Sequence, residues 1–587
     1  MELNMKKQIK WVCAVALFLT ASAAVIVGGL CATKSPVLHD GTYTGTGEGR
    51  NGPITLSITV AGGKLEGGEV LSEDESDFAK PAIQAVIDQA VKGNSVTGLD
   101  AVSGATLTSA GTMAALGQAF AKASGRAESD SLTKKKLEDV SCDIVIVGAG
   151  GAGLTAATEA ASHGASVIVL EKMGIAGGNT NASTGGLNAS QTSVQDSRGI
   201  EDTNEQFYND TMKGGYNLND PALVRTLTEH SAQTVDWLMS IGADLSDVGK
   251  MAGSTNSRTH RPQGGGAIGA HLVPVLLKAA ESAGADIRYR STVTKILSAN
   301  GSTAGVAVQT ADGSYKVNAK AVILATGGFG ANSGMVVQYK HDLEGFGTTN
   351  HKGATGDAFA LVEPFNVALV DMEQIQTHPT VVPSNGVMIT EAVRGNGAIM
   401  VNREGKRFGN EMATRDVMSA DILAQTGKTA YLLFDQGVRE SLKAIEDYAK
   451  QGLLIQAQTV SELAEKLNMP KDVLAQTVMS YNQAQASGTD LDFGRRGADM
   501  PRALETAPFY AVEVGPAVHH TMGGIKINSD AQVLTTSGNA VPGLFAAGEV
   551  TGGVHGGNRL GGNAISDITV FGKIAADSAL LYISTVD

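Results

Sequence analysis

The stretch Asp143-Ile144-Val145-Ile146-Val147-Gly148-Ala149-Gly150-Gly151-Ala152-Gly153 decides the fold. Its apolar half predicts a buried strand, and its glycines predict a tight turn that brings backbone close to a pyrophosphate. The alanine-rich residues 154–163 predict a helix whose N-terminus faces the phosphates. A second strand, predicted at 166–170, ends at Glu171, where a carboxylate can hold ribose hydroxyls. The sequence therefore predicts a dinucleotide site on a Rossmann-like α/β fold.

Length and composition bound the class of protein. With 587 residues, 73 of them glycine, the chain suits a loop-rich α/β enzyme of several domains. A net charge of −14 argues against a nucleic-acid partner. Only three cysteines occur, and no C-x-x-C-H, which excludes a disulfide framework, a Cys-ligated cluster and a c-type haem. We expect no metal site, so a redox enzyme with this sequence needs another electron relay.

The N-terminus has the pattern of an export signal. Lys6, Lys7 and Lys10 precede the uncharged run 11–32. The run is also long enough for an uncleaved anchor, since about 20 residues span a bilayer. Cys31 suggests lipidation, although Leu30 is a poor residue before a lipidated Cys. We expect export, to the periplasm or anchored at the cell surface.

Shifts in composition predict the domain organisation. Apolar strands followed by glycines recur at 321–328 and 543–549, so the nucleotide fold is discontinuous and holds an insertion. The predicted segments are a signal peptide or membrane anchor (1–36), a small α+β domain (37–126), a linker (127–140), the first part of the nucleotide-binding domain (141–376), an inserted α+β capping domain (377–515) and the second part of the nucleotide-binding domain (516–587).

Two later segments resemble the second and third flavin-contacting segments of FAD-dependent oxidoreductases. They are Ala325-Thr326-Gly327-Gly328 and Gly543-Leu544-Phe545-Ala546-Ala547-Gly548-Glu549. The resemblance implies FAD, with Glu549 beside the ribityl chain. The expected FAD contacts are Gly148, Gly150, Gly151, Gly153, Glu171, Lys172, Gly178, Asn179, Thr180, Gly185, Gly186, Gly327, Gly328, Gly548, Glu549, Asn563 and Ala564.

Four further motifs narrow the family: Gly177–Thr180, Gln376–Thr380, His519–Gly524 and His555–Asn563. They resemble the soluble fumarate reductases of the flavocytochrome c type and, more distantly, the flavoprotein subunit of succinate dehydrogenase and L-aspartate oxidase. The resemblance covers nearly everything from Cys142 onward. Relatives that tether FAD do so through a His in the segment matching 178–186; this chain has none there, so we expect non-covalent FAD.

Reduction of an unsaturated dicarboxylate needs a hydride, a proton and two clamped carboxylates, and Arg with His suits the clamping. The resemblance implies that Arg559 and His519 hold one carboxylate while His378 and Thr390 hold the other. His520 is an alternative to His519. Gln376, Met388 and Gly562 are further expected substrate contacts. The implied proton donor is Arg415, supplied through Glu391 and Arg394, which are spaced for one helical turn.

A second flavin is predicted near the N-terminus. Asp100–Thr106 fits D-x-x-S-G-A-T and resembles the pattern at which a flavin transferase joins FMN to the final Thr by a phosphodiester. FMN on Thr106 would supply the missing relay, from a membrane-linked donor through FMN and FAD to substrate.

The leading hypothesis is thus an exported fumarate reductase. Other unsaturated acids, of the methacrylate, acrylate, urocanate or cinnamate type, are alternatives. Urocanate reductases resemble one another in having Tyr and Asp at the positions of His378 and Thr390, which favours a dicarboxylate here. An extracytoplasmic flavin electron carrier is the alternative of another class, but a carrier would have no use for Arg415 and Glu391 beside Arg559.

Overall fold

The computed structural model describes residues 38–49, 52–75, 79–96, 99–100, 102, 105–125 and 135–586. The chain divides into two compact units, Met1–Ser131 and Leu132–Asp587. The predicted leader at 1–36 and most of the predicted linker, 127–134, lie outside the described residues. Within the described part of the chain, no helix combines the length and apolar character needed to cross a membrane.

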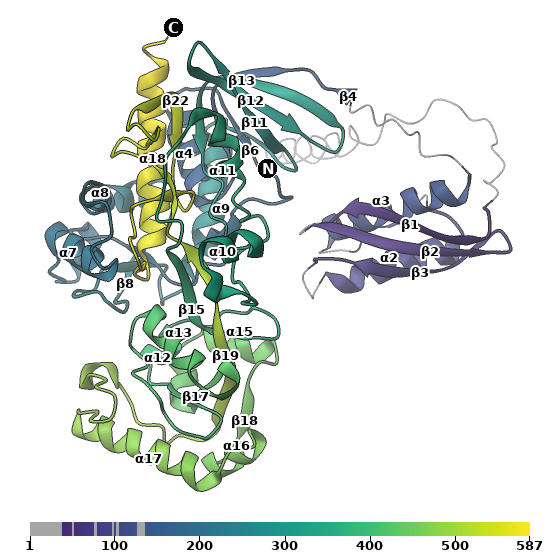
Figure 1. The fold of residues 1–587 in the computed structure, drawn as a ribbon. Coiled ribbons are helices and arrows are strands. Elements are labelled where there is room, and N and C mark those ends of the chain that lie inside the picture. The colour runs from purple at the N-terminus through teal and green to yellow at the C-terminus, as the bar shows by residue number, and fades with distance from the viewer. Residues whose placement is uncertain are drawn as a thin grey trace, which may run out of the picture. The chain divides into compact units, whose positions relative to one another are not determined.

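The N-terminal unit is a three-stranded antiparallel sheet covered by two helices (Figure 1). Its elements are β1 (Gly41–Glu48), β2 (Pro53–Ala61), β3 (Lys64–Ser72), α2 (Lys80–Gly93) and α3 (Thr106–Ala123). A Cβ on Gly45 would lie 2.1 Å from the carbonyl oxygen of Ala115, so α3 packs its backbone directly on β1. Strand β3 was not predicted, because two central glycines interrupt its alternation.

The large unit is built around a sheet in the order β10-β6-β5-β13-β12-β11, with β22 and β4 also paired to β13 and β21 paired to β22. Its strands are β4 (Lys135–Lys136), β5 (Val140–Val147), β6 (Val167–Leu170), β10 (Asp286–Arg288), β11 (Thr292–Ala299), β12 (Ser302–Gln309), β13 (Gly313–Leu324), β21 (Gln532–Leu534) and β22 (Ala540–Ala546). Strands β6, β5, β13 and β22 are parallel. The Rossmann-like α/β class is confirmed.

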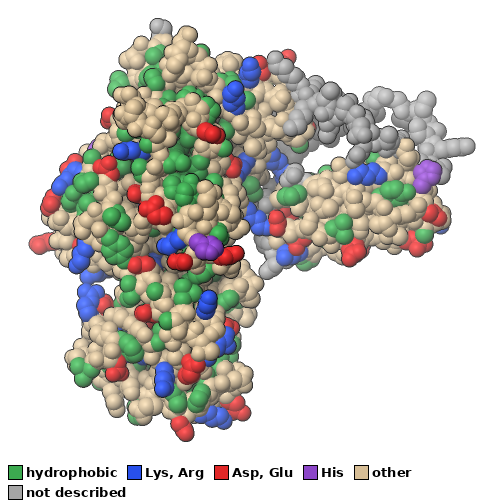
Figure 2. Space-filling model, in the orientation of Figure 1, with side chains coloured by type: hydrophobic (Ala, Val, Ile, Leu, Met, Phe, Trp, Pro, Cys, Tyr) green, Lys and Arg blue, Asp and Glu red, His purple; other side chains and the backbone are tan. Residues whose placement is uncertain are grey.

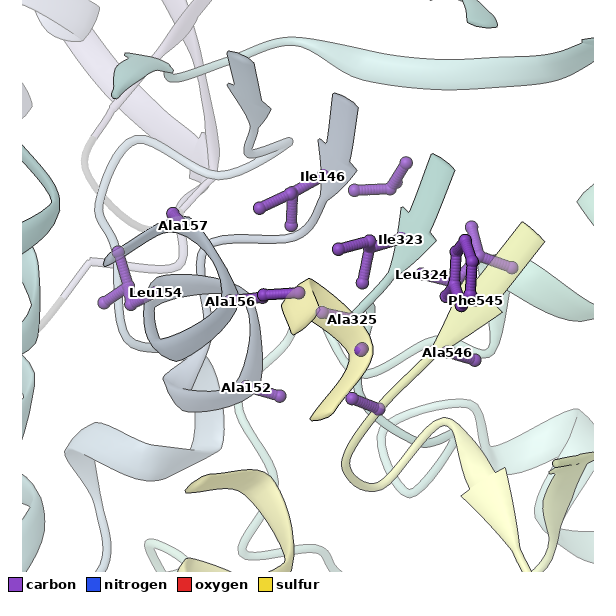
Figure 3. Packing of buried hydrophobic residues seen from close by; sticks show 14 of the residues in the cluster. Ile146, Ala152, Leu154, Ala156, Ala157, Ile323, Leu324, Ala325, Phe545 and Ala546 are labelled. Carbon is purple, nitrogen blue, oxygen red and sulfur yellow. The ribbon is translucent and has the colours of Figure 1, made fainter. Parts of the chain in front are cut away.

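Helix α4 (Gly151–Ser162) joins β5 to β6 and packs on the sheet. Figure 3 shows Ala156 on the side of α4 that faces Ile323 of β13, and both belong to one buried core that also includes Leu154 and Ile146. The other α-helices of this part are α5 (Gly178–Asn181), α6 (Ser193–Ser197), α7 (Asn204–Gly214), α8 (Pro221–Ser240), α9 (Ile268–Ser282), α10 (Ser333–Tyr339), α11 (Asp357–Val362) and α18 (Asn563–Ile583).

The predicted linker is wrong at its C-terminal end. Residues 135–136 form β4, which pairs with β13, and β5 begins at Val140. The Leu137 amide donates to the Ser314 carbonyl at 2.9 Å, so this segment belongs to the sheet. The run of lysines suggested a solvated linker, but lysines are also typical of exposed sheet edges.

An antiparallel sheet with its own core forms the inserted part, which we call the clamp (Figure 1). Its strands are β15 (Ile375–Val381), β16 (Ile399–Val401), β17 (Ala430–Asp435), β18 (Ile455–Ala457) and β19 (Phe509–Thr521). Its helices are α12 (Ala392–Gly395), α13 (Arg415–Leu423), α14 (Gln436–Glu440), α15 (Ala444–Lys450), α16 (Val460–Lys466) and α17 (Lys471–Ser487). Strands β15 and β19 run from the clamp back toward the nucleotide-binding part.

Candidate active site

A first cavity of about 850 Å³ lies at the carboxyl ends of β5, β6 and β13. It is the crevice in which parallel sheets bind nucleotides. The predicted FAD contacts that line it are Gly148, Gly150, Gly151, Glu171, Lys172, Gly178, Asn179, Thr180, Gly327 and Glu549. Its lining also includes Ser291, Thr292, Val293 and His351, which no sequence motif marked.

The glycines of this cavity have two different tasks. A Cβ on Gly150 or Gly327 would meet nothing within 4 Å, so bare backbone faces open space there. A Cβ on Gly153 would lie 1.9 Å from the Gly148 carbonyl oxygen, and one on Gly328 would lie 2.0 Å from the Thr521 hydroxyl. The first pair leaves room for a ligand, and the second pair permits close packing behind it.

Two other predicted FAD contacts also lie behind the cavity. Gly548 adopts φ +79°, and a Cβ there would lie 3.0 Å from the Ala152 side chain. Asn563 accepts a hydrogen bond from Asn188 at 2.7 Å and donates one to Thr211 at 3.1 Å. Both residues therefore shape the loops around the cavity.

Glu171 is fixed at the end of β6. Its carboxylate accepts hydrogen bonds from the Ala149 amide at 2.9 Å and the Met173 amide at 2.7 Å. Burial raises the pKa of Glu171. Beside it, Lys172 pairs with Asp357 at 2.6 Å. Together with the bare glycines and the N-terminus of α4, these groups fit the ribose and pyrophosphate of a dinucleotide.

A second cavity, of about 1310 Å³, shares Asn179, Thr180, Glu549 and Ile568 with the first. The predicted residues that line it are Gly185, Gly186, His378, Met388, Thr390, Glu391, Arg415, His519, Arg559, Gly562 and Ala564. His520, the alternative to His519, lines it as well, and so do Met251, Thr349 and Val387, which sequence reasoning missed. Residues far apart in the chain thus meet at one place.

Gln376 lies behind this cavity and joins its two guanidinium groups. Its Oε1 accepts hydrogen bonds from Arg415 at 3.1 Å and from Arg559 at 3.1 Å. Its amide nitrogen donates to Asn558 at 2.6 Å, which fixes its orientation. Gln376 therefore sets the spacing of the two arginines.

A chain of charges leads away from Arg415. Its Nε donates to Glu391 at 2.7 Å, and Arg394 approaches the same carboxylate oxygen at 3.4 Å. Arg394 is 2% exposed, and its Nη1 donates to the Glu411 carbonyl at 2.6 Å. Burial opposes ionisation of Glu391, but Arg415 and Arg394 outweigh it and hold its pKa at about 2. Glu391 and Arg394 share the turn that their spacing predicted.

Two histidines of the second cavity, His378 and His519, pack edge to face with ring centroids 5.1 Å apart. His378 Nδ1 accepts from the Thr380 amide at 3.3 Å, which leaves its proton on Nε2. His519 Nδ1 contacts the Thr349 hydroxyl at 2.7 Å. Burial, reinforced by the charge of Arg415, lowers the pKa of both rings well below the ordinary value. Both rings are therefore neutral.

The positive charge of the site comes from buried groups. Burial, with the charge of Arg415 beside it, lowers the pKa of the Arg559 guanidinium, which is 5% exposed. On the face shown in Figure 2, acidic and basic side chains are interspersed over the surface of the large unit. An anion would thus be recognised inside the molecule, where charge is least screened.

A dinucleotide cavity opening into a pocket of buried arginines and histidines defines a flavin-dependent oxidoreductase. The FAD binding domain family matches residues 143–565, and the FMN-binding domain family matches residues 49–121. The fumarate reductase (cytochrome) of Shewanella frigidimarina is 49% identical over 442 residues, 75% of this chain and 77% of that protein.

The urocanate reductase of Eggerthella lenta is 35% identical over 560 residues, 92% of each chain. Among solved structures, the open conformation of a flavocytochrome c3 fumarate reductase matches with a TM-score of 0.67 and 43% identity, covering 76% of this chain and 79% of that one. The chain therefore belongs to the flavocytochrome c-type fumarate reductase family, with an FMN-binding domain at its N-terminus.

Proposed function

We propose that this protein is an exported enzyme that reduces fumarate to succinate. The observation that carries the proposal is the placement of two guanidinium groups, Arg415 and Arg559, and two neutral imidazoles, His378 and His519, around one cavity beside the FAD site. Arg394, Arg415 and Arg559 carry three positive charges, and Glu391, which contacts both Arg394 and Arg415, carries one negative charge, so a small dianion would offset the remaining two.

Arg559 and His519 hold one carboxylate, and His378 with Thr390 holds the other. Thr390 is itself fixed, because its amide donates to the Tyr448 hydroxyl at 3.0 Å. Gln376 keeps Arg559 in place while the substrate binds. The alkene is thereby oriented toward the side of the second cavity that borders the FAD site.

Bound FAD would supply a hydride to one alkene carbon. Arg415 gives a proton to the neighbouring carbon, so the double bond gains a hydride and a proton and becomes a single bond. Glu391, 2.7 Å from Arg415 and ionised at rest, relays a proton from Arg394 to Arg415, and solvent ultimately replaces the proton of Arg394. A second cation beside Arg415, the Arg559 guanidinium held by the same Gln376 oxygen, and a carboxylate that can return the proton, Glu391, are what make a guanidinium usable as an acid here.

Electrons reach the site through FMN joined covalently to Thr106 by a flavin transferase, with a membrane-linked protein as donor. Thr106 is the first residue of α3. The loop before it is tied to α2, because the Asp100 amide donates to Gln89 at 2.8 Å and Gln89 donates back at 3.1 Å. A helix start suits a permanent attachment point, and covalent attachment prevents loss of FMN outside the cell. The protein is periplasmic or anchored at the cell surface.

A urocanate-reducing relative that matches the chain over most of its length makes other unsaturated acids the competing proposal. Fumarate is the substrate we prefer, because urocanate reductases have Tyr and Asp at the positions of His378 and Thr390. A monocarboxylate such as acrylate or methacrylate would use only one of the two carboxylate-binding pairs, so the two pairs can be tested separately.

Replacing His378 by Ala should lower kcat/KM for fumarate about 10- to 100-fold, because one hydrogen bond to a carboxylate is lost. Acrylate, with one carboxylate, should lose much less. The measurement is steady-state kinetics with a reduced viologen donor. His341→Ala, an exposed histidine away from the cavity, is the matched control. An equal fall in kcat/KM with both substrates would contradict the assignment of one carboxylate-binding pair to each carboxylate of fumarate.

KM for fumarate should stay constant between about pH 6 and pH 8. The pKa values of His378 and His519 lie well below the ordinary value, so both rings stay neutral throughout this range. Only further acidification would protonate the rings, and the added positive charge would then change the binding of the carboxylates. Initial-rate kinetics across this range provide the check. A KM that changes through about pH 6.5 would show that a substrate-binding histidine has an ordinary pKa.

A further inference from the structure

Tyr216 follows α7 and reaches the clamp across the boundary of the nucleotide-binding part. Tyr216 and Asn217 adopt φ values of +59° and +57°, a left-handed conformation that L residues seldom adopt. Two such residues in succession need support from their surroundings, and strained backbone of this kind is concentrated at functional sites.

The Tyr216 hydroxyl donates a hydrogen bond to Oδ2 of Asp416. Asp416 directly follows Arg415 in the first turn of α13. The other carboxylate oxygen of Asp416, Oδ1, is buried and has no hydrogen-bond partner among the described residues. The tyrosine therefore supplies the side-chain contact of a carboxylate that stands beside the proposed proton donor.

On its other side, Tyr216 meets the segment that carries the second arginine. A Cβ on Gly557 would lie 3.0 Å from the Tyr216 ring, and the Gly557 amide donates to the Gly215 carbonyl at 2.9 Å. Gly557 precedes Arg559 by two residues. The segment 215–216 thus contacts both the start of α13 and the loop that carries Arg559.

We propose that Tyr216 is a positioning residue, which through Asp416 fixes Arg415 relative to Arg559. The inference rests on the proposed function and deepens it. Gln376 joins the two guanidinium groups behind the cavity. The Tyr216–Asp416 hydrogen bond, together with the Gly557–Gly215 backbone hydrogen bond, joins the segments that carry the two arginines. Without the outer contact, the first turn of α13 is free to move, and small displacements of a catalytic group are costly.

The test compares FAD-loaded wild-type protein with Tyr216→Phe, Asp416→Ala and the double variant, using reduced viologen and fumarate. Tyr216→Phe should lower kcat about 10- to 100-fold, and KM should change less than about threefold. The double variant should be no slower than the slower single variant, because both changes remove one contact. Tyr208→Phe, eight residues earlier in α7, should leave kcat unchanged.

A second measurement does not depend on turnover. Hydrogen exchange of 415–423 should be faster in Tyr216→Phe than in wild type, while the thermal unfolding midpoint stays the same. Wild-type kcat in Tyr216→Phe, or losses that multiply in the double variant, would overturn the inference. If wild-type protein fails to reduce fumarate, the proposed function fails, and the exchange rate of α13 still decides whether Tyr216 holds this helix.

Discussion

Arg415→Ala should abolish fumarate reduction, with a fall in kcat of at least about 10³-fold, while FAD stays bound. The side chain lines the second cavity and is held by Glu391 and Gln376. Positioned general acids contribute about 10²- to 10⁴-fold to turnover, and loss of Arg415 also disturbs Glu391. The measurement is kcat with reduced viologen, alongside the flavin absorbance of the purified protein.

Arg403→Ala is the matched control. Arg403 is a partly exposed clamp residue paired with Glu513 at 2.6 Å, away from the cavity, so its loss should leave kcat unchanged. An Arg415→Ala protein that retains FAD and more than a tenth of wild-type kcat would exclude Arg415 as the acid.

Thr106→Ala should remove covalent FMN completely, since alanine has no hydroxyl on which the phosphodiester can form. Intact-mass analysis of the protein, produced together with a flavin transferase, measures the adduct. Fumarate reduction driven by reduced viologen should persist if this donor reaches FAD directly, whereas electron transfer from the membrane-linked donor should stop.

Thr46→Ala provides the comparison for this experiment. Thr46 is an exposed threonine on β1 of the same unit, with its hydroxyl 3.1 Å from that of Thr55. The adduct should survive in this variant. A flavin adduct that persists in Thr106→Ala would show that FMN is attached elsewhere.

The nucleotide-binding core could be predicted from the sequence because its signals are local. The strand, glycine turn and helix around Gly148 are contiguous, and each glycine is required by a close contact or an open approach. The predicted C-terminal end of the linker was wrong, because the two-residue strand at 135–136 is defined by its pairing with β13 and not by a local pattern. Local patterns do not report such pairing.

The candidate site depended on a family resemblance, because its residues come from segments far apart in the chain. His378, Arg415 and Arg559 are brought together by β15, α13 and the loop before α18. The bridging role of Gln376 appears only when both arginines are placed beside it. Thr349 and Tyr216 carry no motif, so their positions follow from the tertiary structure alone.

Steady-state turnover of fumarate by the FAD-loaded protein, compared with methacrylate, acrylate, urocanate and cinnamate under the same reduced viologen donor, tests the central claim most directly. The buried pair of carboxylate clamps predicts the highest kcat/KM for fumarate. A kcat/KM for fumarate no greater than that for the other acids would contradict it.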